Sequence, residues 1–63
     1  MVIINGEPKD AAGKTVMELL ASMNLLPERT AVIVEGEILL KSGYDRILAD
    51  GDTVEIIGFV GGG

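Results

Sequence analysis

Apolar and polar positions at the start of the chain predict a tight hairpin. Residues 2–4 form a short β-branched run that ends at Asn5-Gly6. This dipeptide accepts the positive φ angles of a type I′ turn, so a return strand is expected at residues 7–10. Pro8 has no N–H to donate to a neighbouring strand, which places the return strand at a sheet edge. Residues 11–14 are expected to form a loop.

A capping box and a helical period predict one helix over residues 16–23. Thr15 and Glu18 have the spacing at which each side chain accepts a hydrogen bond from the other residue's free backbone N–H. Asn24 suits a left-handed cap, and Pro27 prevents continuation of the helix. Four apolar residues recur at i, i+3, i+4 and i+7 and are expected to share one buried face: Val16, Leu19, Leu20 and Met23.

A second hairpin is expected after the helix. Residues 31–34 are uniformly apolar, and we expect them to be buried without a clear alternation between the two faces of a sheet. A turn at residues 35–37 contains Gly36 and leads into a second apolar run at residues 38–40. The two runs are therefore expected to be neighbouring strands.

The segment over residues 41–50 is polar and irregular. Tyr44, Ile47 and Leu48 are its expected inward-facing anchors, and the tyrosine is expected to pack its ring while its hydroxyl stays at the surface. Asp50-Gly51-Asp52 then signals another turn.

The last strand is expected over residues 53–60. Apolar residues on both of its faces from Ile56 onward favour a central place in the sheet. The order hairpin, helix, hairpin, link and final strand describes the β-grasp (ubiquitin-like) fold of the α+β class, a mixed sheet of four to five strands with one main helix across one face. Its first and last strands lie side by side and parallel. We expect one domain over residues 1–60 and a flexible glycine tail over residues 61–63.

Composition excludes several kinds of chemistry. The 63 residues suffice for one domain and include neither cysteine nor histidine. The commonest nucleophiles, general bases and zinc ligands are therefore missing, and we expect neither catalysis nor a metal site. The net charge of −5, without a Lys/Arg cluster, disfavours nucleic acid as a partner. No apolar run reaches membrane-spanning length and no secretion signal is visible, so we expect a cytoplasmic protein.

The chain ends in three glycines directly after its most apolar strand. One interpretation is a frayed end or a linker without function. The other is a narrow ribbon, in which Gly61 and Gly62 pass through a channel of a partner enzyme because they carry no side chain. Three extended residues reach about 10 Å. The carboxylate of Gly63 would then be an acylation handle, which can accept a sulfur or amine nucleophile once it is activated as a mixed anhydride.

Four segments taken together resemble the ThiS family of sulfur carriers in thiamine biosynthesis. They are the residues 2–7, 15–20, 50–55 and 59–63, and the resemblance covers essentially the whole chain. It implies that an E1-like adenylyltransferase of the ThiF type uses ATP and Mg²⁺ to convert the Gly63 carboxylate into an acyl-adenylate. Sulfur from cysteine, delivered through a cysteine desulfurase, then displaces AMP and leaves a thiocarboxylate. Thiazole synthase of the ThiG type takes up this sulfur, and the carrier itself binds no cofactor.

The resemblance also implies that the apolar sheet surface beside the tail docks partner enzymes. Ile57, Phe59 and Val60 are the residues expected to do so, and ordinary core packing is the alternative explanation for all three. Gly61 differs from the alanine that many family members carry there. This change loosens the tail and leaves its chemistry intact.

Other functions share the same glycine tail. The small subunit of molybdopterin synthase, a carrier for cysteine or another sulfur metabolite, and a protein modifier joined to lysines would all end in this way, although the first is usually longer. From a different class, the chain could be a β-grasp interaction module without a carrier role. Net negative charge and the lack of a fused domain disfavour such a module. The glycines alone do not separate these alternatives.

Overall fold

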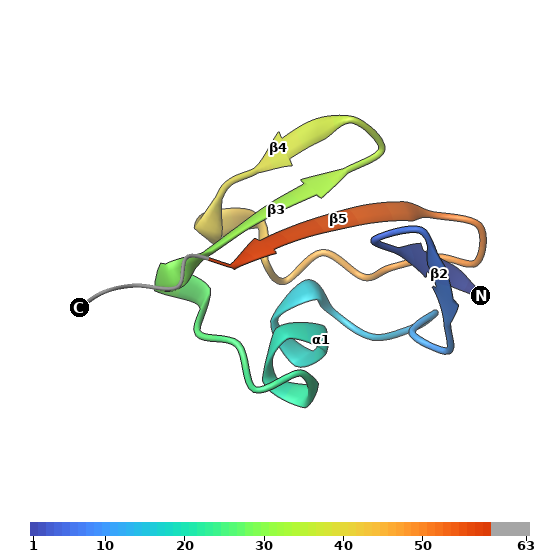
Figure 1. Cartoon of the computed structure of the whole chain (residues 1–63), viewed down its shortest axis with the longest axis horizontal. Helices are drawn as coiled ribbons and strands as arrows, with labels where there is room; N and C mark the ends of the chain where they lie inside the picture. Colours follow the sequence, from blue (N-terminus) through green and yellow to red (C-terminus); the bar gives the residue numbers. More distant parts are fainter. Residues whose placement is uncertain (59–63) are drawn as a thin grey trace.

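The computed structural model describes residues 1–58, which form a five-stranded mixed sheet and one α-helix (Figure 1). The sheet order is β2-β1-β5-β3-β4, so the last strand is central, as its sequence predicted. Single 3-10 turns lie at Pro27–Arg29 and Lys41–Gly43. The regular elements are β1 (Val2–Ile4), β2 (Glu7–Lys9), α1 (Val16–Ser22), β3 (Thr30–Val34), β4 (Glu37–Leu39) and β5 (Thr53–Gly58).

The strand pairing confirms the predicted arrangement of two hairpins around a central strand. β1 pairs antiparallel with β2, β3 pairs antiparallel with β4, and β5 joins the two hairpins. It runs parallel to β1 with Ile3 opposite Thr53, and antiparallel to β3 with Thr30 opposite Gly58. β2, which contains Pro8, lies at one edge of the sheet, as expected for a residue without an N–H.

Both hairpins turn through two residues with positive φ. Asn5 and Gly6 have φ of 51° and 83°, and Glu35 and Gly36 have φ of 51° and 81°. Two successive positive φ angles define the type I′ turn, whose twist matches that of the flanking strands. Asparagine tolerates this region well, whereas a glutamate there is strained by about 1–2 kcal/mol. The first turn is the one that Asn5-Gly6 predicted.

The helix begins at the predicted capping box. The backbone N–H of Glu18 donates to Oγ1 of Thr15 at 3.1 Å, and the backbone N–H of Thr15 donates to Oε1 of Glu18 at 2.8 Å. The hydrogen bond from the Thr15 backbone N–H to the Glu18 carboxylate, and then the interaction of the Thr15 side chain with the same carboxylate, lower the pKa of Glu18, and the charge of Lys14 adds to the effect. The helix ends at Ser22, one residue before the predicted end, and Asn24 follows with a left-handed φ of 58°.

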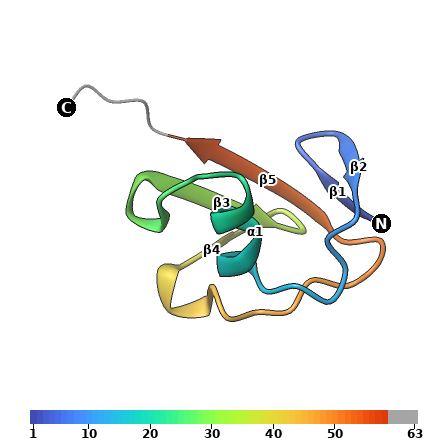
Figure 2. The same ribbon diagram turned by 90° about the horizontal axis from the view of Figure 1, so that it is seen from below.

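The hydrophobic core lies between α1 and one face of the sheet (Figures 1 and 2). Burial alternates along β3, so the expectation that residues 31–34 would be buried without a clear alternation was wrong. Burial also alternates along β5 as far as Ile56. Met23, expected on the buried face of the helix, is 38% exposed because it caps the helix beyond the sheet. The buried apolar residues are Val2, Ile4, Ala11, Val16, Leu19, Leu20, Val32, Val34, Tyr44, Leu48, Val54 and Ile56.

The irregular link packs against the start of the helix. Tyr44 and Leu48 are buried, as predicted, whereas Ile47 is 65% exposed, so its prediction as an anchor was wrong. The backbone of Ile47 forms an isolated bridge with Thr15, and this bridge directs its side chain outward. The Tyr44 hydroxyl was expected at the surface, but it is buried and donates to the carbonyl of Thr30 at 3.2 Å. A buried hydroxyl needs such a partner, which the sequence did not reveal.

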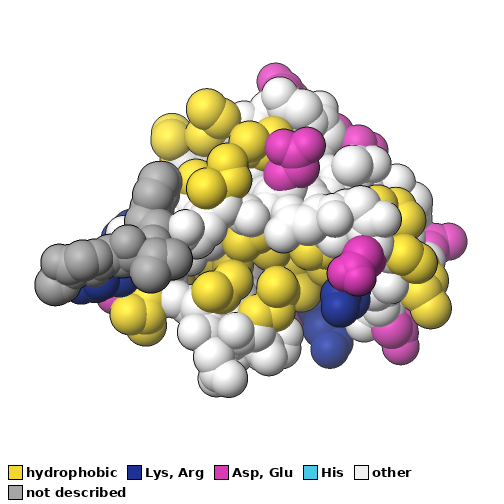
Figure 3. Space-filling model, in the orientation of Figure 1, with side chains coloured by type: hydrophobic (Ala, Val, Ile, Leu, Met, Phe, Trp, Pro, Cys, Tyr) yellow, Lys and Arg dark blue, Asp and Glu magenta, His cyan; other side chains and the backbone are white. Residues whose placement is uncertain are grey.

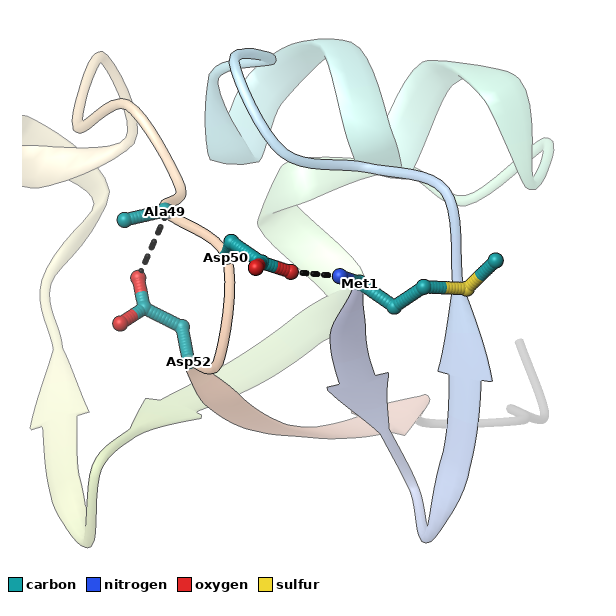
Figure 4. A network of polar contacts seen from close by, with 4 residues as sticks. All are labelled: Met1, Ala49, Asp50 and Asp52. Atoms are coloured by element: carbon teal, nitrogen blue, oxygen red, sulfur yellow. Dashed lines mark hydrogen bonds and ion pairs between the residues drawn. The ribbon is translucent and has the colours of Figure 1, made fainter.

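A polar network holds the turn before β5 against the N-terminus (Figure 4). The amino group of Met1 forms an ion pair with Asp50, and the N–H of Gly51 donates to the Met1 carbonyl at 2.8 Å. Oδ2 of Asp52 accepts from the N–H of Ala49 at 2.9 Å. The ion pair is exposed and adds little by itself, so the backbone bonds fix the turn that leads into the central strand.

Candidate functional site

The candidate site is the C-terminal end of β5, next to the residues that the sequence predicted to carry the chemistry. Phe59, Val60 and residues 61–63 lie outside the described residues, so their predicted roles stay predictions. Ile57 is the member of the predicted set that the structure places. It is 48% exposed and its neighbour Gly58 ends β5.

β5 is anchored on one side by the side chain of Asn5. Backbone pairing with β1 stops where the N–H of Asn5 donates to the carbonyl of Val54 at 2.9 Å. Beyond this point Oδ1 of Asn5 accepts from the N–H of Ile56 at 2.8 Å, and Nδ2 donates to the Ile56 carbonyl at 3.3 Å. The side-chain amide therefore replaces the peptide group that a longer β1 would offer. We call these two hydrogen bonds the Asn5 clamp.

β3 supports the same end of β5 from the other side. Thr30 pairs with Gly58, and Ala31 pairs with Ile57. Thr30 is buried, its hydroxyl donates to the carbonyl of Leu26 at 2.6 Å, and its own carbonyl accepts the Tyr44 hydroxyl. The strand beside the last residues of β5 is thus tied both to the segment after the helix and to the irregular link.

Sequence reasoning missed both supports. Asn5 was recognised as a turn residue, but the partner of its side chain is 51 positions away, and no local pattern indicates that distance. The Tyr44 bond had one usable signal. Tyr44 was expected to pack its ring inward. A tyrosine that packs inward usually brings its hydroxyl to a hydrogen-bond acceptor inside the fold, and this tendency argues against a hydroxyl at the surface.

The sheet face opposite α1 presents an apolar surface beside the end of β5. We call it the open face, formed by Ile3, Ala31, Ile33, Ile38, Thr53, Glu55 and Ile57, which alternate with core residues along their strands. The register puts Ile57 opposite Ala31 and Ile33 opposite Ile38. Leu40 continues the extended backbone after β4 and lies on the same side. Aliphatic side chains therefore extend across three neighbouring strands, from Ile57 to the sheet edge.

Two further observations concern residues 1–58 alone. In that part of the chain no group of three or more Asp, Glu, His or Cys side chains is placed to hold a metal ion. No helix within it is long and apolar enough to span a membrane.

The strand order, the parallel pairing of the first and last strands and the single crossing helix define a β-grasp protein of the ubiquitin-like kind. The crystal structure of the thiamine biosynthesis protein (ThiS) from Geobacter metallireducens superposes with a TM-score of 0.76 at 34% identity, over 98% of this chain and 97% of that one. The model of the ThiS family matches residues 2–63. This chain belongs to the ThiS family.

Two relatives contain a sequence similar to this chain, one as a whole protein and the other as part of a longer protein. The sulfur carrier protein ThiS of Thermus thermophilus is 41% identical over 64 residues, across the full length of both chains. A thiazole synthase of Paramagnetospirillum magneticum is 39% identical over 64 residues, which are 98% of this chain and 20% of that protein. A segment similar to this chain therefore occurs both as a separate small protein and within a longer thiazole synthase polypeptide.

Proposed function

We propose that this chain is a sulfur carrier of thiamine biosynthesis and that the carboxylate of Gly63 is the group that carries the sulfur. The observation that carries the proposal is similarity over the full length to a separate carrier protein of the same family. The chain is then a carrier and a substrate of partner enzymes, and the chemistry takes place at its backbone terminus. A cytoplasmic location belongs to the same proposal.

The proposed chemistry converts the carboxylate of Gly63 into a thiocarboxylate in three steps. A carboxylate oxygen of Gly63 attacks the α-phosphorus of ATP and releases pyrophosphate, which leaves an acyl-adenylate. The terminal sulfur of the desulfurase's persulfide then attacks the acyl carbon and AMP departs, which leaves an acyl disulfide. A thiol reductant cleaves the S–S bond of this disulfide, and the carrier ends in a thiocarboxylate. The partner adenylyltransferase of the ThiF type supplies the ATP site and Mg²⁺, and a cysteine desulfurase supplies the sulfur. Gly61 and Gly62 are proposed to thread the partner's channel because they add no side-chain bulk.

Within the described residues, the end of β5 next to the proposed tail is held on both sides. The Asn5 clamp fixes β5 on one side and the pairing of Thr30 with Gly58 fixes it on the other. A partner enzyme that binds the sheet therefore finds the end of β5 in a fixed position. Such positioning before the reaction lowers the entropy lost in binding. The division into a domain at residues 1–60 and a tail at 61–63 is part of the proposal.

The open face is proposed as the docking surface for the partner enzymes. Ile57 is half exposed and lies in the middle strand of the sheet, next to the proposed tail. Phe59 and Val60 are proposed as further contacts. A thiazole synthase of the ThiG type is the favoured occupant, because the relative of that name contains a segment similar to this chain within the same polypeptide. A carrier in a separate chain must bind through its surface, whereas a fused one is held by its covalent link.

The decisive experiment follows the mass of the intact chain. Incubation with ATP, Mg²⁺ and a ThiF-type adenylyltransferase should add AMP at Gly63, and a desulfurase with cysteine and a thiol reductant should then exchange one oxygen atom for sulfur. A chain that lacks Gly62 and Gly63 is the control and should show neither product while its thermal unfolding stays nearly unchanged. Absence of both products under conditions in which the Thermus thermophilus carrier reacts would exclude the proposal.

The pathway is tested separately by supplying the thiocarboxylate form to thiazole synthase and to molybdopterin synthase. Sulfur transfer to the thiazole product alone supports thiamine biosynthesis. Transfer only in the molybdopterin reaction, or attachment of the chain to lysines, would assign the carrier to another pathway.

A further inference from the structure

The two hairpins have the same geometry, but their outer strands differ at one equivalent position. In each hairpin the second residue after the turn pairs with the second residue before it: Pro8 with Ile3 in the first, Ile38 with Ile33 in the second. Both positions lie in edge strands of the sheet, β2 and β4. The equivalent position is therefore a proline at one edge and an isoleucine at the other.

This position decides whether an edge can accept another strand. In a two-residue hairpin the residues that flank the loop exchange hydrogen bonds, and the next pair does not. The backbone N–H and C=O of Ile38 therefore point away from β3, toward the free side of the sheet. At the equivalent place in β2 the proline has no N–H, so that edge is blocked. The edge formed by β4 keeps both its donor and its acceptor.

The same edge also carries the most exposed large apolar side chains among the described residues. Ile38 is 74% exposed and Leu40 is 70% exposed. Figure 3 shows hydrophobic side chains gathered over the region of β4, at the upper left of the view. Natural sheets usually protect such an edge with a proline or a charged residue, and here neither stands at the outward position.

We propose that β4 pairs antiparallel with β4 of a second copy of this chain, about a two-fold axis at Ile38. In this register the N–H of Ile38 in each copy donates to the Ile38 carbonyl of the other, so both outward groups are satisfied at once. The two isoleucine side chains lie side by side on the same face, where cross-strand aliphatic pairs are favourable. The two sheets join into one, with the helices of both copies on the opposite side.

Charge complementarity supports a second copy as the occupant. Glu35 and Lys41 are exposed and flank β4, Glu35 in the turn before it and Lys41 at the start of the 3-10 turn after it, each three residues from Ile38. Antiparallel pairing centred on Ile38 places the turn that carries Glu35 of each copy beside the turn that carries Lys41 of the other, so two regions of opposite charge related by the symmetry axis face each other. A closed two-fold contact of this kind is self-complementary by construction.

The proposed dimer does not rest on the carrier function, although Ile38 also belongs to the open face. Ile57 lies in β5, which β3 separates from β4, so the contact leaves the end of β5 uncovered. The contact is short and should be weak, so dimer formation is expected to depend on protein concentration. Failure of the dimer test would therefore leave the sulfur-carrier proposal unaffected, and the reverse also holds.

Sedimentation velocity over a series of protein concentrations tests the proposal. The wild-type chain should shift from monomer toward dimer as concentration rises. Ile38→Pro, which copies Pro8 into the second hairpin, should raise the Kd about tenfold or more, because both central hydrogen bonds are lost. Ile38→Thr should also weaken the dimer, whereas Ile47→Thr, which changes an exposed isoleucine outside the sheet, should leave the Kd unchanged. A circular dichroism melt of each variant reports whether it folds.

Two further measurements keep the test valid if the proline variant does not fold. Lys41→Glu alone should weaken the dimer, and adding Glu35→Lys should restore it. In a mixture of labelled and unlabelled chains, NMR should show a contact between Glu37 of one copy and Leu39 of the other. Two results would overturn the proposal: a chain that stays monomeric at every concentration, or a dimer that neither Ile38 variant weakens. A purely monomeric chain would leave the β4 edge as a binding site for a different protein.

Discussion

The Asn5 clamp offers a direct measure of how firmly the end of β5 is held. Its two hydrogen bonds join one side chain to the N–H and the carbonyl of Ile56, at 2.8 and 3.3 Å in a partly buried setting. Each such bond contributes about 0.5–1.5 kcal/mol, so losing the pair should lower the free energy of unfolding by about 1–3 kcal/mol. For a chain of this size that is a large share of the total stability.

Asn5→Gly is the most informative substitution because it removes the amide without straining the turn. Asn5 has a φ of 51°, which glycine adopts freely and alanine does not. Asn5→Ala should therefore cost more than Asn5→Gly, by about 1 kcal/mol. Asn24 is a matched control, since it also has a positive φ, 58°, and lies outside the sheet. Asn24→Gly should change the stability by only a few tenths of a kcal/mol.

Denaturant unfolding and amide hydrogen exchange measure the two consequences separately. In Asn5→Gly the amide of Ile56 should exchange much faster, because its acceptor is gone, while the amides in the β3–β5 ladder should follow the global change in stability. The rate of the adenylation that we propose at Gly63 should fall as well if the clamp positions the tail. An Asn5→Gly chain with unchanged stability and unchanged exchange at Ile56 would refute the role given to the clamp.

Three shorter predictions concern other contacts. Tyr44→Phe should lower the free energy of unfolding by about 1 kcal/mol, measured in urea, because the buried hydroxyl loses its carbonyl acceptor. Hydrogen bonds from Thr15 hold the pKa of Glu18 below its ordinary value of 4.5, so the ionised carboxylate stabilises the fold above pH 4.5. The difference in free energy of unfolding between the wild type and Glu18→Ala should therefore shrink as the pH falls through the folded-state pKa. Ile57→Lys should weaken binding to thiazole synthase in a titration without lowering the melting temperature, and equal weakening by Ile47→Lys would count against the open face.

Local chemical signals explain which parts of the fold could be predicted from the sequence. The Asn5-Gly6 turn, the Thr15–Glu18 capping box and the edge position imposed by Pro8 depend on a few neighbouring residues, and all three were confirmed. Each signal acts through backbone hydrogen bonds within the same hairpin or helix turn. Such features need no knowledge of distant contacts.

Apart from Met23 at the helix end, the wrong predictions concern residues whose surroundings are set by distant parts of the chain. Ile47 and Leu48 are adjacent and both strongly apolar, but the bridge to Thr15 directs the side chain of Ile47 outward and that of Leu48 into the core. The run at residues 38–40 was expected only as a neighbour of residues 31–34, and its apolar residues do not indicate that it forms an edge strand and the start of a link. A three-residue strand carries too little pattern to distinguish an edge from a centre. The glycine tail was predicted from its chemistry, and its placement lies outside the described residues.

The central position of β5 has a consequence for synthesis on the ribosome. Residues 53–58 are translated after all the other strands, yet they join the two hairpins, with Ile3 meeting Thr53 across fifty positions of sequence. Until β5 emerges, neither hairpin has its main partner in the sheet, and an isolated two-stranded hairpin is barely stable in water. We therefore expect a nascent chain that stalls before β5 to stay unfolded and open to proteolysis.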